Sequence, residues 1–395
     1  MPNLNGPLEG IRVLDLGRYQ AGPRCGLMFA RLGAEVIKVE RPQGDESRAN
    51  GPFVRGQSAY WVQYNSGKKS LTLELRKEEG RQVLRDLVKV SDVLIQNFRP
   101  GVMDLMGLGY EALRSVNKRI IMVNVSAYGQ DGPYRDRVGF DPIGQAMSGV
   151  MSLTGSPDGP PMRTFATIVD RVTALHATIG ALAALRERDL SGEGQAIDVS
   201  LADTGYTLME IPIAAYLGGG AVPPRTGNVV GPTPSNAYQC RDGWVYIIAL
   251  AEDMWLPACR AMGRADWPAD PSLRTRKDRE KHAAELEAGV EAWCRERTVQ
   301  EVVDAFVREG VPVSPVNDVP AAAADPHLAA RELLMEVPDP VAGRIHVAGK
   351  MVKLSRTEMV VGSAPTIGQH TDEVLKSILR YTPERIKALR AEGVV

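Results

Sequence analysis

The sequence predicts an α/β protein whose mostly parallel sheet is covered by helices on both faces. Short β-rich runs alternate with helical patterns through the first half of the chain, which is typical of βαβ units. Hydrophobic residues make up 44% of the chain and charged residues 24%, which are ordinary values for a globular protein. The 395 residues are enough for a large core and for two domains.

Strands and helices alternate from the first strand onward, which is IRVLDL at residues 11–16. The run AGPRCGLMFARLG (21–33) predicts a helix that ends at Gly33. Further strands are expected at 34–40, 70–75, 92–98, 119–128 and 195–201, and further helices at 77–90 and 203–217. Because helical patterns separate strands in this half, the strands are expected to run parallel.

Composition changes beyond the middle of the chain. Residues 218–236 are rich in Gly, Pro and Asn and show almost no periodicity, so we expect a linker or a functional loop there. A smaller second domain is expected after it, with a strand at 244–250 and helices at 278–297 and 299–310. The tail then continues through a strand-like run at 344–350 to two helices.

Composition also excludes several kinds of partner. The 47 basic and 48 acidic residues give a formal charge of −1. The chain therefore lacks the excess of positive charge that is typical of proteins that bind nucleic acid or an anionic membrane. No stretch approaches the roughly 20 apolar residues that span a bilayer, and the opening MPNLNGPLEG does not resemble a signal peptide. Cys25, Cys240, Cys259 and Cys294 have no CxxC spacing, and the histidines are scattered. We expect a soluble, cytoplasmic protein without a metal site.

The first strand-to-helix turn lacks a dinucleotide-binding motif. Such a turn needs GxGxxG, so that the backbone can approach a pyrophosphate. Residues 16–24 read LGRYQAGPR and supply only Gly17 and Gly22. The P-loop motif GxxxxGK[ST] and the GxSxG motif of α/β-hydrolases are also absent. This pattern disfavours a dinucleotide-binding protein, which stays as one alternative.

Cations, an amide and an aromatic residue lie at the ends of predicted strands. Arg41 follows the second strand, Lys68 and Lys69 precede another, and Asn97 and Phe98 end a fourth. Each alone fits a solvated surface position. Since open α/β sheets bind ligands at strand ends, together they suit a phosphorylated nucleotide with an adenine to pack.

An acidic residue, Asp170, lies near the start of the apolar stretch FATIVDRVTALHATIGALAAL (165–185). Apolar residues recur there at steps of three and four and predict one buried helical face: Val172, Leu175, Ile179, Leu182 and Leu185. Asp170 precedes that face, where a carboxylate can accept amide hydrogens of the first turn and cap the helix. On local grounds, capping is a sufficient reason for this acid.

Segments along essentially the whole chain, in the same order, resemble the class III coenzyme A transferases. This is the formyl-CoA and carnitine-CoA transferase family, of the CaiB/BaiF type. The segments are PLEGIRVLDLGRYQAGPRCGLMFARLGAEVIKVERPQGDESR, YNSGKKSLTLEL, NFRPGVMDLMGLGYEAL, SAYGQDGPYRDRVGFDPIGQAMSGVMSLTGSPDGPPMR and GQHTDEVL. In that family the nucleophile is an aspartate after the SGxMxxTGxPDGPP run and just before an apolar helix. Asp170 stands in that place.

The resemblance implies that Asp170 attacks the thioester carbonyl of an acyl-CoA and passes through an aspartyl anhydride and an aspartyl-CoA thioester. The substrates implied are an acyl-CoA and a small carboxylic acid, with no cofactor beyond the CoA thioester. Ile168, Val169 and Val172 would keep water from the anhydride.

The resemblance also implies CoA-binding roles for several residues. They are Gln20 and Ala21 along the bound CoA, Arg41 near the adenine and 3′-phosphate, Lys68 at a phosphate, Asn97 and Phe98 near the pantetheine, and Met106 at a further CoA contact.

The fold implied by the resemblance is an interlocked homodimer. Each chain would have a large Rossmann-like CoA-binding domain built from both chain ends, at 1–217 and 325–395. A linker or active-site loop at 218–236 and a small α+β domain at 237–324 would complete it.

Two departures from family patterns limit the activity. Related α-methylacyl-CoA racemases carry GHD where this chain has GFD at Phe140, and phenylalanine can act as neither acid nor base. Because Glu252 stands where racemase-like members also show a glutamate, a racemase-like isomerase stays as the alternative.

Residues 227–236 replace the four-glycine loop of the oxalate-specific members. The chain resembles the succinyl-CoA-using branch of the family more closely than the oxalate-using branch.

Overall fold

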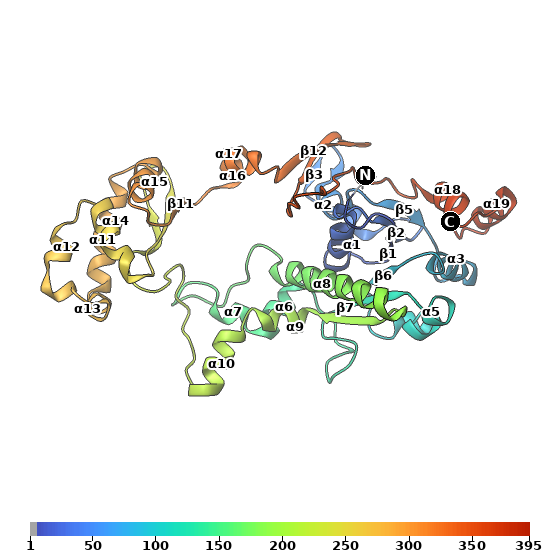
Figure 1. Ribbon diagram of the computed structural model, residues 1–395, viewed down its shortest axis with the longest axis horizontal. Coiled ribbons are helices and arrows are strands. Elements are labelled where there is room, and N and C mark those ends of the chain that lie inside the picture. Colours follow the sequence, from blue (N-terminus) through green and yellow to red (C-terminus); the bar gives the residue numbers. More distant parts are fainter. Residues whose placement is uncertain (1–5) are drawn as a thin grey trace. The chain divides into compact units, whose positions relative to one another are not determined.

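The computed structural model describes residues 6–395, which form two compact units (Figure 1). The first unit comprises the chain up to Met151, Arg163–Val222 and His327–Val395. The second comprises Ser152–Met162 and Pro223–Pro326. Both chain ends therefore contribute to the first unit. The assignment of separate functions to the domains stays a prediction.

A six-stranded sheet forms the centre of the first unit. Its strands are β1 (Arg12–Asp15), β2 (Glu35–Glu40), β5 (Lys69–Thr72), β6 (Val93–Gln96), β7 (Ile121–Ser126) and β8 (Ala196–Ser200). Neighbouring strands all run parallel, in the spatial order β5-β2-β1-β6-β7-β8. The predicted parallel sheet is confirmed. The strand order reverses between β1 and β6, and doubly wound folds bind ligands at the carboxyl ends of strands at such a point.

The remaining elements of the first unit surround this sheet. The helices are α1 (Ala21–Arg31), α2 (Ala59–Asn65), α3 (Glu78–Val88), α4 (Val102–Leu105), α5 (Tyr110–Val116), α6 (Asp141–Ser148), α8 (Ile168–Ser191), α9 (Leu201–Thr207), α10 (Glu210–Gly219), α18 (Thr371–Glu373) and α19 (Pro383–Ala391). A 3₁₀ turn (Glu46–Ala49), a π turn (Val374–Ile378) and two hairpins, β3 (Phe53–Val54) with β4 (Gln57–Ser58) and β12 (Leu334–Asp339) with β13 (Gly343–Ala348), complete it.

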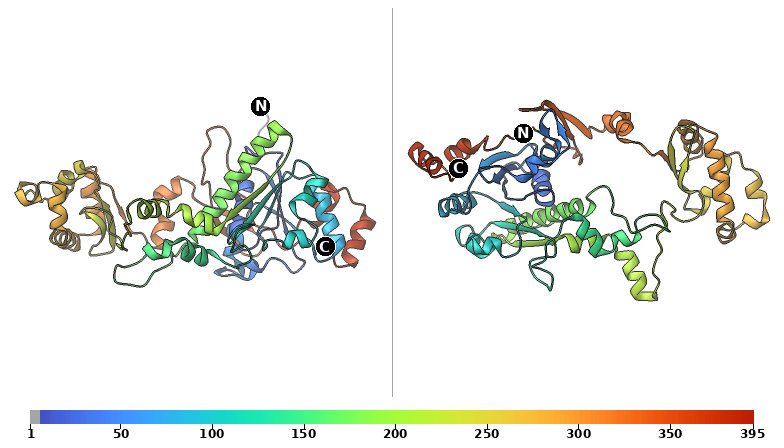
Figure 2. Two further views of the ribbon diagram at one scale, coloured as in Figure 1. Left: turned by 90° about the horizontal axis from the view of Figure 1, so that it is seen from below. Right: turned by 180° about the vertical axis from the view of Figure 1, so that it is seen from behind.

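Strand side chains alternate between two hydrophobic layers. Leu14 of β1 packs in a layer with α3, α5 and α19, whereas its neighbour Val13 packs in a layer with α1 and α8. This alternation follows from the strand geometry, in which successive side chains point to opposite faces. Ile386 and Leu389 place α19 in the first layer, and Figure 2 shows the C-terminal helices beside α3. Both faces of the sheet are therefore covered.

The buried face of α8 differs from the predicted one. It consists mainly of small residues: Val169, Thr173, Ala174, Ala177, Thr178, Ala181, Ala184, Leu185 and Arg188. Leu175 and Ile179, expected in the core, are 42% and 64% exposed. Alanine and threonine let α8 approach the sheet and α1 closely, so the larger side chains lie on the opposite face. Within residues 6–395, α8 is the one helix long and apolar enough for a bilayer, and its small-residue face is already buried.

The helix expected at 203–217 is interrupted. α9 ends at Thr207 and α10 begins at Glu210. Pro212 stands in the first turn of α10, where its missing N–H costs nothing, but it could not continue an unbroken helix.

The second unit is a small α+β unit. Its antiparallel sheet has the order β11 (Val313–Pro315), β10 (Trp244–Ile248) and β9 (Ser235–Gln239). Its helical segments are Glu252–Met254, α11 (Trp255–Ala261), α12 (Asp266–Ala269), Pro271–Leu273, α13 (Arg276–Lys281), α14 (Ala283–Arg295), α15 (Val299–Arg308) and α16 (Val319–Ala324). Two short helices, α7 (Val150–Leu153) and α17 (Pro326–Ala330), lie at the boundaries between the units. Val245, Val290 and Phe306 form part of a core of its own.

Candidate functional site

Two adjoining cavities lie at the carboxyl edge of the parallel sheet. The first, of about 270 Å³, is lined by residues that follow β1, β2, β5 and β6. The second, of about 510 Å³, is lined by residues that follow β1, β6 and β7. Arg18, Phe98 and Val102 line both. The cavities therefore meet where the strand order reverses, the place that the topology predicts for a ligand.

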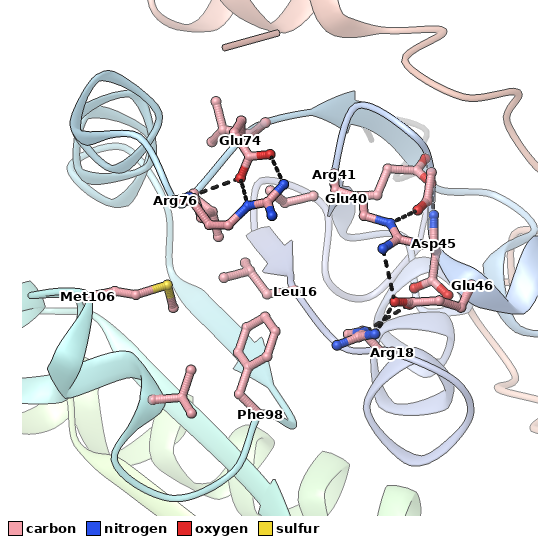
Figure 3. A pocket seen from close by; sticks show the side chains of 15 residues that line it. Leu16, Arg18, Glu40, Arg41, Asp45, Glu46, Glu74, Arg76, Phe98 and Met106 are labelled. Carbon is pink, nitrogen blue, oxygen red and sulfur yellow. Dashed lines mark hydrogen bonds and ion pairs between the residues drawn. The ribbon is translucent and has the colours of Figure 1, made fainter. Parts of the chain in front are cut away.

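The first cavity combines arginines with an apolar surface (Figure 3). Arg41 donates to the Gly44 carbonyl at 2.9 Å and pairs with Glu46 at 3.4 Å. Leu16, Phe98 and Met106 supply the apolar part. Arg41, Phe98 and Met106 were expected near a ligand from the sequence, and the structure brings them together.

Three arginines line this cavity, and two of them, Arg18 and Arg76, were not identified from the sequence. Arg76 follows β5 as Arg41 follows β2, so its place after a strand was the available signal. Its side chain pairs with Glu74 at 2.7 Å yet stays 82% exposed. An exposed guanidinium at the rim remains accessible to an anionic ligand.

The turn between β1 and α1 is held by Asn97. The Asn97 Oδ1 accepts from the Arg18 N–H at 2.7 Å, and its Nδ2 donates to the Arg18 carbonyl at 2.8 Å. A Cβ on Gly22 would come within 3.0 Å of Gly17 Cα, so the turn also needs glycine at its close approach. Gln20 and Ala21, which follow in the turn, line the second cavity together with Asn97.

Lys68 lines neither cavity, so its expected contact with a phosphate finds no support there and stays a prediction. Its Nζ is fully buried and donates to Asp15 Oδ2 at 2.6 Å, to the Pro23 carbonyl at 2.7 Å and to Asn65 Oδ1 at 3.0 Å. Burial lowers the pKa of Lys68 to about 8. Lys68 thus supports the β1–α1 turn from inside the protein.

Asp170 lines the second cavity and is the third residue of α8. Thr167 occupies the N-cap position, so the expectation that Asp170 itself caps the helix is wrong. The side chain of Gln20 donates to Thr167, which joins the β1–α1 turn to the start of α8. The apolar neighbours fit the expected exclusion of water: Val169 is fully buried, and Ile168 is partly buried.

A second carboxylate, Asp141, fixes the backbone at Asp170. The Asp170 N–H donates to Asp141 Oδ1 at 3.0 Å, and Gln145 Nε2 donates to Asp141 Oδ2 at 2.6 Å. Burial raises the pKa of Asp170 to about 7, and the nearby charge of Asp141 adds to the rise. A desolvated carboxylate that ionises near neutrality is suited to nucleophilic attack or to proton transfer. Asp141 is the aspartate of the GFD segment, in which the sequence pointed only to Phe140.

The residues relevant to a racemase are placed in different units. Phe140 lines the second cavity and stacks edge-to-face on Tyr19, with ring centroids 5.7 Å apart. Glu252 belongs to the second unit, where its carboxylate pairs with Arg279 at 2.5 Å. Phe140 therefore offers the cavity no acid or base.

The strand order and the adjoining cavities define a doubly wound α/β protein with a partly buried carboxylate, Asp170, at the larger of the two cavities. The chain belongs to CoA-transferase family III, whose sequence model matches residues 8–371. The resemblance to class III CoA transferases is confirmed, and the protein is an enzyme of that family.

Several known proteins are similar over nearly the full chain. Succinyl-CoA–D-citramalate CoA-transferase of Chloroflexus aurantiacus is 38% identical, with 98% of each chain covered. Succinyl-CoA:glutarate CoA-transferase of Homo sapiens is 33% identical over 98% of this chain and 90% of the relative. The crystal structure of a CAIB/BAIF family protein from Brucella suis superimposes with a TM-score of 0.86 at 32% identity, covering 95% of this chain and 100% of that one.

Proposed function

We propose that the protein transfers CoA from an acyl-CoA, with succinyl-CoA as the donor, to a carboxylic acid through Asp170. One observation carries the proposal: Asp170 is the one carboxylate among the described residues that line the second cavity, and its pKa is raised to about 7. The printed names of similar enzymes that use succinyl-CoA with D-citramalate, L-malate or glutarate support this donor.

Asp170 would act as a covalent carrier of the acyl group and then of CoA. Its carboxylate attacks the thioester carbonyl, the C–S bond breaks, and CoA thiolate leaves behind a mixed anhydride. The thiolate attacks the aspartyl carbonyl, releases the donor acid and forms an aspartyl-CoA thioester. The acceptor carboxylate attacks that thioester and expels the thiolate, which attacks the acceptor's carbonyl in the new anhydride. The new acyl-CoA leaves and the Asp170 carboxylate is restored.

The two cavities suggest how CoA would lie. The first cavity, with Arg41 and Arg76, would take the adenine and the 3′-phosphate. Phe98, which lines both cavities, would lie along the pantetheine and lead the thioester toward Asp170 in the second cavity.

A homodimer, interlocked as the resemblance implies, would cover the exposed apolar surface. α10 is an apolar helix without one buried residue, and its Ile211 and Leu217 are 78% and 76% exposed. Exposed apolar helix faces of this kind mark association surfaces.

A covalent adduct provides the direct test of this function. Mixing the protein with succinyl-CoA is expected to give an intact-mass increase that hydroxylamine removes and that is missing in Asp170→Ala. The absence of an adduct with every acyl-CoA tried would contradict the proposal. Incorporation of deuterium at the α carbon of a branched acyl-CoA without an acceptor would instead favour the racemase alternative.

The pH dependence of transfer should report the ionisation of Asp170. The pKa of Asp170 is raised to about 7, so the attacking carboxylate is depleted below that pH. We expect kcat/KM for the acyl-CoA to rise about tenfold per pH unit below pH 7 and to level off above it. Asp141→Asn removes the neighbouring negative charge and should move the midpoint to lower pH. A profile that is flat between about pH 5 and 8 would exclude Asp170 as the titrating nucleophile.

A further inference from the structure

Two arginines near Asp170 have no acidic partner in the part of the chain that the structure describes. Arg171 is the next residue along α8, and its charge acts on Asp170. Arg24 lies on α1, one turn after Gln20, whose side chain donates to Thr167 at the start of α8. α1 packs directly on α8 through their shared hydrophobic layer. The charge of Arg171 also acts on Arg24, so the two guanidinium groups lie near each other where α1 packs on α8.

The surroundings of Arg24 leave its hydrogen-bonding capacity unused. Its Nε is buried and has no hydrogen-bond partner within residues 6–395. Its Nη2 contacts only the Met351 sulfur, at 3.9 Å, among the side-chain contacts described. Burial lowers the pKa of Arg24, and the like charge of Arg171 lowers it further. Arg24 is only partly exposed, so its guanidinium is expected to favour an anion, because an unpaired cation removed from water is costly.

Tyrosine side chains from α2 complete the surroundings of Arg171. Burial raises the pKa of Tyr64, and the positive charge of Arg171 together with its hydrogen bond to the phenol opposes that rise. Tyr60 packs edge-to-face on Tyr64, with ring centroids 4.9 Å apart. The charge of Asp170 also reaches Tyr60. The arginines, the two phenols and Asp170 therefore belong to one polar cluster on α1, α2 and α8.

The anion that this cluster lacks is unlike the phosphates of CoA. The cations suited to those phosphates, Arg41 and Arg76, line the first cavity, whereas Arg24 and Arg171 line neither cavity and are joined to Asp170 through the start of α8. Arg171 instead adjoins the residue that would receive the acyl group. A planar guanidinium binds a carboxylate through two parallel hydrogen bonds. The chemistry of the cluster thus fits a carboxylate on the acyl side of the reaction.

We propose that Arg24 and Arg171 bind the second carboxylate of a dicarboxylic substrate, the one remote from the reacting carbon. The proposal rests on the transfer through Asp170 and deepens it by naming the substrate class. The pair selects dicarboxylates over monocarboxylates of equal chain length, because only a dicarboxylate supplies the missing anion. Tyr64 presents its hydroxyl to the same carboxylate.

Matched acceptors test this selectivity. The assay compares kcat/KM for succinate with butyrate, and for glutarate with pentanoate, using one acyl-CoA donor throughout. The wild-type protein is expected to prefer the dicarboxylate in each pair. Arg24→Met is expected to reduce that preference by about 10- to 100-fold, the worth of a lost charge-assisted hydrogen bond. Arg24→Lys keeps the positive charge but cannot donate the two parallel hydrogen bonds of a guanidinium. Its preference for the dicarboxylate should lie between those of wild type and Arg24→Met.

Two further variants keep the result interpretable. Arg171→Gln changes an exposed side chain, so it should fold normally and also reduce the preference. Arg186→Gln is the matched control, because Arg186 is an exposed arginine on the same helix about four turns further on, and it should leave the preference unchanged.

The outcomes separate this proposal from the proposed function. If the wild-type protein forms the Asp170 adduct but shows no preference for dicarboxylates, the subsite is wrong while the nucleophile stands. The subsite is also wrong if Arg24→Met and Arg171→Gln both keep the wild-type preference. If no adduct forms with any donor, the proposed function itself fails.

Discussion

Asp170→Asn is expected to lower the rate of CoA transfer by about 10⁴-fold or more, since an amide cannot act as the nucleophile. The same substitution should stabilise the folded protein at alkaline pH. Burial raises the pKa of Asp170 from its ordinary value to about 7, so the folded state holds a proton that the unfolded state releases. Stability is therefore lost as pH rises from about 4 to 7, at a cost of about 4 kcal/mol once the group is ionised. Asparagine carries no such charge.

Urea denaturation at about pH 5 and pH 8 measures this effect. The gain in unfolding free energy of Asp170→Asn over wild type should be larger at the higher pH. Asp189→Asn, which changes an acid 61% exposed on the same helix, is the control and should show no comparable gain. Asp170→Ala guards against deamidation of the asparagine. Transfer at the wild-type rate in both variants would show that another group is the nucleophile.

Lys68→Met is expected to destabilise the protein by about 3–5 kcal/mol, because it leaves the buried carboxylate of Asp15 without its partner. Asp15 also accepts from the Gly17 N–H at 2.8 Å, and Lys38 donates to the Gly17 carbonyl. The buried pair therefore holds the turn that carries Gln20. A lysine that bound a phosphate would behave differently: its loss would raise the KM for acyl-CoA and leave stability unchanged.

A double-mutant cycle separates the two roles. Asp15→Asn combined with Lys68→Met removes both charges, so it should be more stable than the sum of the single losses. Lys69→Met is the matched control. Its side chain is 31% exposed and pairs with Glu35 and Glu373, so the loss should stay within about 1 kcal/mol. If Lys68→Met unfolds at the wild-type midpoint of denaturation but binds acyl-CoA weakly, the result supports a contact with a CoA phosphate and excludes the structural role.

The fold was largely predictable because its signals are local. The strand at 11–16 and the helix at 21–33 appear as β1 and α1, with shorter ends. Alternating apolar residues identify a strand, and the following turn and helix make a parallel neighbour the expected arrangement. The broken helix at 203–217 was also within reach of a local rule, since Pro212 cannot continue an unbroken helix.

The environment of each site residue was less predictable. The periodicity of α8 indicated a helix, but two of its faces could have been buried. Packing against α1 and the sheet selected the small-residue face and left Ile179 exposed. Likewise, Lys68 and Arg41 are both cations next to strands in the sequence. In the structure, Lys68 is buried and pairs with Asp15, whereas Arg41 lines a cavity. Burial depends on residues distant in the sequence, which a local pattern does not reveal.

The sequence by itself determined the parallel α/β fold, the family and the position of Asp170 at the start of an apolar helix. The tertiary structure decided what surrounds that acid. It brought Asp141 from another helix against the Asp170 backbone and raised the pKa of Asp170 to about 7 by burial. It also placed Arg24 of α1 near Arg171 without an acidic partner among the described residues. The physical reason is that desolvation and charge pairing act through space, between residues that the chain order keeps far apart.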